Sequence, residues 1–304
     1  QVVIRRIQVP PLPAPLACTG VQCDYDTGIM DANDDDNGAA HFHSDGRDFL
    51  RDGTRTGIPA NLKYAISAPT GTQASTGKSF KQMLEDALTN HQENEMDGLD
   101  ATTPGREVLR WNNEGKRTIA ATDSLTSNQI TDFVNKVKAR ATVIGVNKKA
   151  PLVLNNGVPT DPTVSVNLGT VTNPTITVIQ GSNDPKDTYT TLSFQGNTQG
   201  AGILIVEDGD IDISGTFRWD GVIIATGKNA GVTFKKNSRS YIYGGMVINE
   251  TKKKEKRQYE FQIERNYHGD SAIDQFTTFY YSQQNIDMLQ QIQGLVRLAT
   301  WREM

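Results

Sequence analysis

The sequence predicts an α+β chain in which an α/β body is followed by a β-solenoid, also called a β-helix. Three observations predict this fold class. Two amphipathic helical patterns lie in the first half of the chain, at 79–92 and 126–141. From about residue 150, short β-type runs follow one another between Gly and Asn turns. Apolar runs led by a glycine begin at Gly202, Gly221 and Gly245, at intervals of nineteen and twenty-four residues.

The composition fits a soluble globular chain. Of its 304 residues, 36% are hydrophobic and 22% are charged, and the net charge of −4 gives no overall reason to expect a nucleic-acid partner. No segment reaches the roughly 20 apolar residues that a membrane span requires. The chain opens with QVVIRRIQV, which predicts a strand, and shows no initiator Met and no basic and apolar leader. We therefore expect that an upstream segment has been removed.

The first segment, up to about residue 74, is rich in loops and holds the two cysteines, Cys18 and Cys23. Its VPPLPAPLA stretch is too dense in proline for a helix or a central strand. The cysteine spacing, across a glycine, favours a small disulfide loop over two free thiols. Half of a zinc site is disfavoured, because no second Cys pair exists and only His41 and His43 are near in sequence. A disulfide would indicate an oxidising, extracytoplasmic compartment.

Each of the two predicted helices has a capping box and an apolar stripe. Ser79 and Gln82 form the box of the first helix, and Thr126 and Gln129 form the box of the second. The stripes consist of Phe80, Met83, Leu84, Ala87 and Leu88, and of Ile130, Phe133, Val134, Val137 and Ala141. No ionisable residue lies on either stripe, so both helices are expected to face the core.

Residues 146–250 are predicted to form the solenoid. Its expected strands are VSVNL, TITVIQG, TLSFQG, GILIV, DIDISG, GVIIATG, GVTFKKN, YIYGG and MVIN. In DGDIDISG the alternation is strict, with Ile211 and Ile213 on one face and Asp210 and Asp212 on the other. In a solenoid each turn stacks an apolar strand on the previous one, and the glycines ahead of the strands are expected where the coil bends and a Cβ would clash. The irregular repeat leaves an antiparallel β-sandwich as the alternative.

The chain is thus expected to have three segments: the α/β body at 1–145, the solenoid at 146–250 and a terminal segment at 251–304. In the terminal segment, YEFQIERNY predicts a half-exposed strand and NIDMLQQIQGLVRLATWREM predicts one amphipathic helix. The helical stripe consists of Ile286, Leu289, Ile292, Val296 and Ala299. A terminal strand and helix need a partner, so we expect this segment to pack back on the body.

The glycine-led lines resemble those of the PilX-like minor pilins of bacterial type IV pilus systems. A β-helical segment of that family carries a line G-x-L-x-V-x-G-x-L-x-I/L-x-G, then G-x-I/V-I/V and then G-G-x-V/I. The lines map to Gly202, Leu204, Val206, Gly209, Ile211, Ile213 and Gly215, to Gly221, Ile223 and Ile224, and to Gly244, Gly245 and Val247. The ending Trp301-Arg302-Glu303 is also similar. The resemblance covers 200–304 and, loosely, 126–141. The apolar N-terminal helix of the family has no counterpart in this sequence.

The resemblance implies a non-enzymatic structural subunit. Such pilins are low-abundance proteins that help to initiate pilus assembly as part of a tip complex and that display a soluble domain on the cell surface. The implied partners are other minor pilins and the major pilin, with a tip adhesin, DNA or a surface as further contacts. The implied location is the extracytoplasmic pilus, with anchoring in the inner membrane before assembly through an N-terminal helix that this chain lacks.

A carbohydrate-active β-helix enzyme is an alternative, because β-helices also host polysaccharide lyases and hydrolases. Those enzymes need carboxylates that converge on one face. The carboxylates at hand are Glu207, Asp208, Asp210, Asp212 and Asp220. With a nineteen-residue turn, Asp208, Asp210 and Asp212 would stack on Gly227, Asn229 and Gly231, so no acid would meet another. No Ser-His-Asp set, G-x-S-x-G motif or phosphate loop is evident, and we predict no catalytic residue.

The first metal candidate is a Ca²⁺ loop in DANDDDNGAAHF. Its ligands would be Asp31, Asn33, Asp35 and Asn37, ahead of Gly38. An EF-hand is excluded, because the twelfth position is Ser44 rather than a bidentate Glu. An acidic turn closed by its own Asx hydrogen bonds is the structural alternative. In HFHSDGRD, His41 and His43 are a second metal candidate, which two exposed rings on a strand explain equally well.

The basic run TKKKEKR is the candidate binding patch. It contains Lys252, Lys253, Lys254, Lys256 and Arg257. Such a run could bind phosphates through counterion release, which makes an adhesion or DNA-binding surface module the third hypothesis. A short basic run is also typical of a solvated loop, and few aromatic residues accompany this one.

Overall fold

The computed structural model of the chain has a strand-rich α+β fold. It describes residues 2–27, 41–73, 76–88, 95–109, 114–146, 150–181, 190–228, 230–236, 238–252, 259–264, 275–292 and 295–301. Two largely parallel sheets, named here the long sheet and the short sheet, make up most of it. No helix within these ranges has the length and apolar character needed to cross a membrane.

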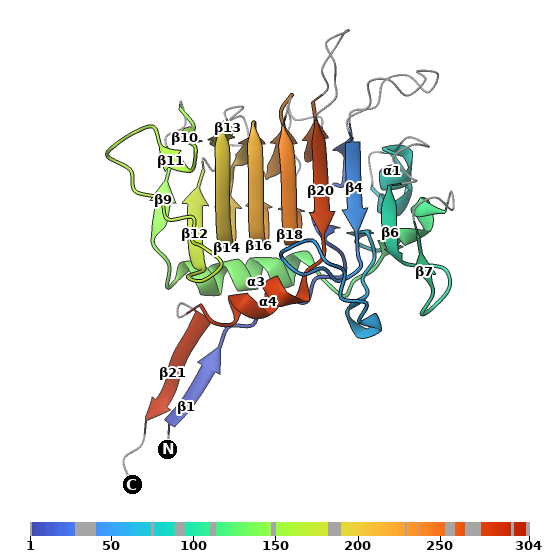
Figure 1. The fold of residues 1–304 in the computed structure, drawn as a ribbon, viewed down its shortest axis with the longest axis horizontal. Coiled ribbons are helices and arrows are strands. Elements are labelled where there is room, and N and C mark those ends of the chain that lie inside the picture. Colours follow the sequence, from blue (N-terminus) through green and yellow to red (C-terminus); the bar gives the residue numbers. More distant parts are fainter. Residues whose placement is uncertain are drawn as a thin grey trace.

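The long sheet is built from parallel strands that lie side by side (Figure 1). In spatial order it contains β7 (Glu107–Val108), β6 (Met96–Leu99), β4 (His41–Asp45), β20 (Phe276–Tyr280), β18 (Arg239–Glu250), β16 (Thr216–Gly227), β14 (Asn197–Glu207), β12 (Thr175–Gln180) and β9 (Val143–Gly145). Along this path only the β6–β7 pair is antiparallel. Most of the strands predicted after residue 150 are therefore present.

The short sheet alternates with the long sheet along the chain. In spatial order it contains β11 (Val158–Pro159), β10 (Leu152–Asn155), β13 (Thr190–Gln195), β15 (Asp210–Ile213), β17 (Gly231–Phe234), β19 (Phe261–Ile263) and β3 (Tyr25–Asp26). From β12 to β20 every strand of the long sheet is followed by one of the short sheet, and neither sheet closes on itself. A β-sandwich has antiparallel neighbours. The sandwich alternative therefore does not describe these strands, which are parallel except for the β10–β11 pair.

Strands from both ends of the sequence extend the same sheets. β2 (Leu16–Cys18) pairs in parallel with β18, β5 (Ile66–Ala68) pairs with β2, and β8 (Ile119–Ala121) pairs with β5. The long sheet thus combines strands from all three expected segments.

A column of glycines crosses the three longest strands at one register. Gly202 of β14 lies opposite Gly221 of β16, which lies opposite Gly244 of β18. Their φ angles of +125°, +138° and +131° lie where side-chain-bearing residues are strained. A Cβ on Gly221 would lie 2.1 Å from the carbonyl oxygen of Gly202. The register therefore aligns Gly244, whereas the sequence repeat pointed to Gly245.

The space between the two sheets is filled by apolar and aromatic side chains. Ile211 and Ile213 of β15 point into it, as their alternation predicts. Trp219 of β16 is fully buried there, and its Nε1 donates a hydrogen bond to the carbonyl oxygen of Gly202 at 3.2 Å. The largest buried side chains of this interior are Trp219, Phe42, Phe194, Phe217, Phe234, Phe261 and Phe279. This interior holds the two sheets together.

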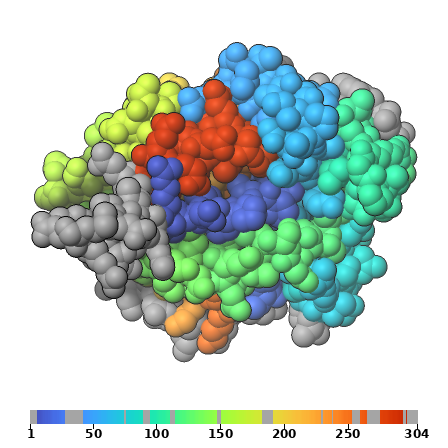
Figure 2. Space-filling view, turned by 90° about the horizontal axis from the view of Figure 1, so that it is seen from below, coloured from blue at the N-terminus to red at the C-terminus, as the bar shows by residue number. Residues whose placement is uncertain are grey.

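Helices cover the outer face of the long sheet downstream of the glycine column. α3 (Ser127–Lys138) and α4 (Gln283–Leu289) pack there, and the N-terminal segment runs between them (Figure 2). The apolar residues of this layer include Ile130, Phe133, Val134, Val137, Met288 and Leu289 from the helices and Ile203, Ile205, Val222, Ile224 and Val247 from the sheet. The predicted capping boxes are present in α1 (Phe80–Asp86) and α3. α1 is shorter than the pattern at 79–92 predicts.

Two sequence predictions of secondary structure are wrong. The terminal stripe is not one helix, because α4 ends at Leu289 and β21 (Val296–Trp301) follows it. β21 pairs antiparallel with β1 (Val2–Arg6), and this ribbon extends away from the sheets (Figure 1). Pairing with a strand from the other end of the chain overrides the helical spacing. The predicted VSVNL strand at 164–168 is not formed.

The short helical turns η1 (Pro59–Asn61) and η2 (Gly115–Thr118) complete the described elements. η1 lies in the long connection that follows β4. The backbone of this connection makes contacts with the outer face of the long sheet, since the carbonyl oxygen of Arg51 accepts a hydrogen bond from Nη2 of Arg218 at 2.7 Å. This connection therefore borders the site described next.

Candidate metal centre

Upstream of the glycine column, the outer face of the long sheet is polar and aromatic. One row across five adjacent strands contains Asp220, Tyr243, Tyr280, Asp45 and Asp97. The row two residues upstream contains Arg218, Tyr241, Thr278 and His43. Because side chains two residues apart share a face of a strand, both rows lie on the same side of the sheet. Acidic, basic and aromatic side chains therefore gather at β4 and its neighbours.

Two buried carboxylates meet where β4 pairs with β6. Asp45 and Asp97 are opposite in register, and both side chains have 0% exposure. Arg47 bridges them, with its Nη2 2.5 Å from Asp45 Oδ2 and 2.8 Å from Asp97 Oδ2. The Nε and the main-chain N–H of Arg47 donate to Asp45 Oδ1 at 2.8 and 2.9 Å. The sequence predicts no contact between acids, but that prediction concerns only residues 208–212. Asp45 and Asp97 are a pair of acids that it does not consider.

His43 completes the cluster from the same face of β4. Its Nε2 lies 3.5 Å from Asp97 Oδ2 and 3.7 Å from Asp45 Oδ2, and its side chain is 13% exposed. The Nε2 atom is itself buried and has no hydrogen-bond partner among the described residues. The ring packs edge-on against Tyr280 at a centroid distance of 5.5 Å, which restricts its rotation. We name His43, Asp45 and Asp97 the His–Asp–Asp cluster.

The electrostatics of the cluster are set by burial. Burial raises the pKa of the Asp45 carboxyl above its ordinary value, although the hydrogen bond and the charge of Arg47 act to lower it. Burial acts to lower the pKa of Arg47. The hydrogen bond to Asp45 and the charges of Asp45 and Asp97 act more strongly in the other direction, so the pKa of Arg47 is raised. The guanidinium therefore stays charged. It engages both carboxylates, so neither is presented as a general base to a solvent-borne substrate.

A second arginine centre lies on the same face and differs in composition. Arg218 donates from Nε to Asp220 Oδ2 at 2.8 Å and from Nη2 to Asp220 Oδ1 at 3.1 Å. Its guanidinium lies 4.5 Å from the centroid of the Tyr243 ring, and Asn285 of α4 also donates to Asp220 at 3.1 Å. One carboxylate here meets one guanidinium. This centre is balanced in charge, whereas the His–Asp–Asp cluster has two carboxylates for its one guanidinium.

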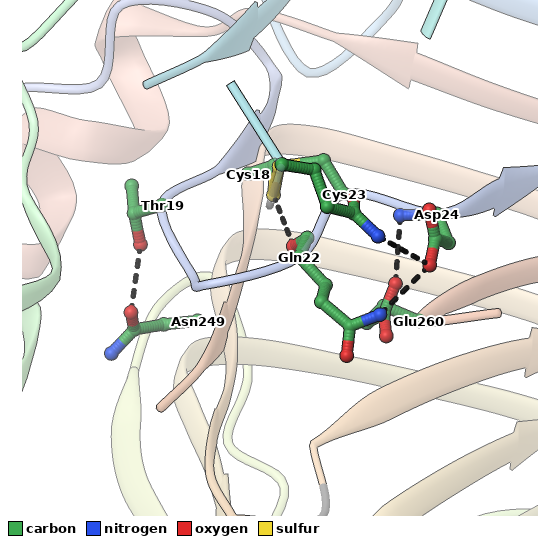
Figure 3. The surroundings of a disulfide bond; sticks show 8 residues. Cys18, Thr19, Gln22, Cys23, Asp24, Asn249 and Glu260 are labelled. Carbon is green, nitrogen blue, oxygen red and sulfur yellow. Dashed lines mark hydrogen bonds between the residues drawn. A yellow bond between two sulfur atoms is a disulfide. The ribbon is translucent and has the colours of Figure 1, made fainter. Parts of the chain in front are cut away.

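The predicted disulfide between Cys18 and Cys23 is present. Figure 3 shows Asp24 and Glu260 beside it. The main-chain N–H of Asp24 donates to Glu260 Oε2 at 2.7 Å. Burial raises the pKa of Glu260 to about 7; a hydrogen bond with the Glu250 side chain acts to lower it, and the charge of Asp24 acts to raise it. Glu250 and Glu260 therefore form a buried carboxyl pair at the end of β18.

Most of the other predicted site residues lie outside the described residues. These are Asp31, Asn33, Asp35 and Asn37 of the Ca²⁺ loop, and Lys253, Lys254, Lys256 and Arg257 of the basic run. Lys252 is described and exposed. Of the two histidine candidates, His43 belongs to the cluster, and the side chain of His41 is not described.

The sequence contained part of the signal for the cluster. In HFHSDGRD, His43, Asp45 and Arg47 recur at every second position, and this spacing places all three on one face of a strand. Sequence reasoning considered the histidines and missed Asp45 and Arg47. Asp97 comes from another strand, and only the parallel register brings it to the site.

Comparison of the chain with protein-family models, with curated proteins and with solved structures found no match. What the cluster can do therefore follows from its own atoms. Its three ligand atoms, one from each residue, all lie within 4.8 Å of one another, a spacing at which they could hold one metal ion. One imidazole nitrogen and two carboxylate oxygens suit a first-row divalent ion. Ca²⁺ instead prefers a shell of six to eight oxygen atoms.

Proposed function

We propose that this chain is a non-enzymatic display subunit of the PilX-like minor-pilin type, with residues 146–250 coiled as a β-solenoid. The glycine column is the observation that carries the proposal. Gly202, Gly221 and Gly244 stack in register, and they begin the three lines in which the sequence resembles these pilins. The alternation of the chain between two parallel sheets supports the coil. In such a coil each turn is stabilised by its neighbours, which makes a stiff support.

The ends of the chain support attachment at one side. β1 and β21 pair with each other and lead away from the sheets (Figure 1). A filament or membrane segment joined ahead of β1 would hold the sheets at a distance from its anchor. The Cys18–Cys23 disulfide supports an oxidising, extracytoplasmic location. The partners of this proposal are other minor pilins and the major pilin.

The state of the carboxylates supports a structural role over catalysis. Asp45 and Asp97 are both bound by Arg47. Within the short sheet, Asp210 and Asp212 lie opposite Gly231 and Thr233 rather than opposite other acids. A glycoside hydrolase requires two carboxyl groups that flank the scissile bond. The acids on these strands are not arranged in that way.

The proposal is tested in the bacterium that carries the gene. Deletion of the gene should reduce the number of surface pili several-fold, and the wild-type gene should restore them. The chain should also be present as a minor component in pili sheared from the cells, as detected by an antibody. Normal pilus numbers in the deletion strain, together with absence of the chain from sheared pili, would contradict the proposal.

A pair of glycine variants connects this test to the fold. Gly221→Ala places a Cβ against the Gly202 backbone and should fail to restore pili. Gly57→Ala is the matched control, because Gly57 also has a positive φ of +68° but no atom within 4 Å of its Cβ position. It should restore pili as the wild-type gene does. Full restoration by Gly221→Ala would contradict the dependence of the function on the coil.

A further inference from the structure

The separations in the His–Asp–Asp cluster suit a shared metal ion better than hydrogen bonds. Nε2 of His43 lies 3.5 Å from Asp97 Oδ2 and 3.7 Å from Asp45 Oδ2. An N–H···O hydrogen bond spans about 2.9 Å, so both distances are too long for one. A Zn²⁺ ion about 2.1 Å from each ligand atom would convert them to angles of about 115° and about 125°, near the tetrahedral value of about 109°.

The charge of the cluster also favours a cation. Asp45 and Asp97 are both removed from solvent, and Arg47 supplies one positive charge. With a neutral imidazole, the four side chains of His43, Asp45, Asp97 and Arg47 together carry one net negative charge. A buried charge that is not compensated is costly, and a bound cation or a proton removes that cost. The long His43 separations favour the cation over a hydrogen-bonding proton.

Arg47 is placed both to compete with the ion and to orient its ligand. Its Nη2 contacts Oδ2 of Asp45 and Oδ2 of Asp97, the two oxygens that would bind the ion. Its Nε and its main-chain N–H also donate to Oδ1 of Asp45, and Nε donates to Oδ2 as well, at 3.0 Å. An ion on Oδ2 would replace the Nε and Nη2 contacts with that oxygen and leave the Oδ1 contacts in place. Hydrogen bonds that orient a ligating carboxylate are typical of metal sites. The guanidinium therefore has to turn away from Oδ2 while Nε keeps its contact with Oδ1.

The surroundings give that end room to move. A cavity of about 250 Å³ is lined by Arg47, Arg55 and Glu107, among others. The charge of Glu107 acts favourably on the Arg47 guanidinium, because it helps to raise the pKa of that group. Displacement of Nη2 from the carboxylates would thus bring it into a space that carries the acidic side chain of Glu107, with which Arg55 already pairs.

We propose that His43, Asp45 and Asp97 bind one Zn²⁺ ion, and that Arg47 caps these ligands until the ion displaces its Nη2. The ion would tie β4 to β6, which are joined by only two register pairs, Ser44–Met96 and Asp45–Asp97. Its role would be to stabilise this end of the long sheet. The proposal does not depend on the pilin role, and it concerns other residues than the predicted Ca²⁺ loop and a metal that accepts an imidazole ligand.

Calorimetry and thermal unfolding of the full chain test the proposal. Zn²⁺ added to metal-free protein should bind at one ion per chain and raise the unfolding midpoint. His43→Gln and Asp97→Asn should each weaken binding by at least about 100-fold and abolish the rise. Asp220→Asn is the matched control, because it removes a buried, arginine-bound carboxylate from the same face, and it should bind Zn²⁺ like the wild type. Equal Zn²⁺ binding by the wild type and His43→Gln would overturn the proposal.

Two further measurements remain informative even if His43→Gln and Asp97→Asn fail to fold. Co²⁺ bound to the wild-type chain should give the intense visible absorption of a tetrahedral site, and the weak absorption of an octahedral ion would overturn the proposal. Arg47→Gln should bind Zn²⁺ at least as tightly as the wild type, because the competing charge is gone and the main-chain N–H of residue 47 still orients Asp45 through Oδ1. Weaker binding by this variant would overturn the assignment of Arg47 as a displaceable cap.

Discussion

The long strands β14, β16 and β18 have two halves that differ in what covers their outer face. Directly downstream of the glycine column, the outer side chains are apolar and lie under α3 and α4, as with Ile205, Ile224 and Val247. Upstream of it, the outer side chains include Asp220 and Tyr243, which an arginine contacts. The inner face contributes apolar side chains in both halves. The interior therefore specifies the stacking of the strands, and the outer face is divided between helix packing and polar chemistry.

The glycine column marks the border between these halves. The backbones approach so closely at this register that no side chain fits, and the strands still pair in parallel on both sides of it. The two halves thus share one register but have different partners. Variants on each side, and at the border, should separate their contributions to stability.

The largest effect is expected at the border, from Gly221→Ala. Its Cβ would lie 2.1 Å from the Gly202 carbonyl oxygen, and backbone in a paired strand cannot shift cheaply. We expect the free energy of unfolding to fall by at least about 4 kcal/mol, as measured by urea denaturation. Gly57 has a φ of +68°, in the left-handed helical region, and open space around its Cβ position, so Gly57→Ala should cost only about 1 kcal/mol. A loss of only about 1 kcal/mol in Gly221→Ala would mean that the close approach does not require glycine at this position.

The next largest effect is expected in the helix-covered half, from Leu289→Ala. Leu289 of α4 has 0% exposure and packs in the layer over the downstream sheet residues. Removal of its side chain should lower the free energy of unfolding by about 3 kcal/mol, because the cavity cannot fully collapse. Ile286→Ala on the same helix is the control, since Ile286 is only partly buried and should cost about 1 kcal/mol. A Leu289→Ala loss no larger than this would show that α4 is not a stabilising cover.

The elements that the sequence predicted well are specified by neighbouring residues. The capping boxes at Ser79 and Thr126, the stripe of α3 and the Cys18–Cys23 disulfide each depend on a few positions close in sequence. The glycine-led repeat also predicted the column, although with an error of one residue at Gly244. Such signals need no knowledge of which strands become neighbours.

The elements that the sequence did not predict depend on distant partners. Asp97 meets Asp45 only because β6 pairs with β4 in one register, and no local pattern sets that register. β21 was predicted as helix because Val296 and Ala299 fit a helical stripe, and it is a strand because β1, from the other end of the chain, pairs with it. The cluster on the polar half can be recognised only once the pairing of β4 with β6 is known. The candidate site was therefore visible in the sequence as single residues and not as a cluster.

A pH-dependent loss is expected at the far end of the downstream half, where β18 ends at Glu250 beside Glu260. Burial holds the pKa of Glu260 at about 7, above the 4.5 of an unperturbed glutamate. The folded state then binds the proton more tightly, so this contribution is fully present below about pH 4.5 and is lost as the pH rises through about 7. Between about pH 5 and about pH 8 the loss should be at most about 2.5 kcal/mol in urea denaturation. Glu260→Gln should remove this difference, and an unchanged pH dependence in that variant would contradict the assignment.

The smallest effect is expected in the polar half, from Arg218→Lys. Lysine keeps the charge but loses the two-pronged contact with Asp220 and the stacking on Tyr243. The side chain is 32% exposed, so we expect a loss of only about 1 kcal/mol in the free energy of unfolding. Arg55→Lys is the matched control, because Arg55 pairs with Glu107 at 42% exposure and should change stability by no more than about 0.3 kcal/mol. If both variants lose the same amount, the packed surroundings of Arg218 contribute nothing beyond an exposed ion pair, and the outer face of the polar half does not help to hold the strands together.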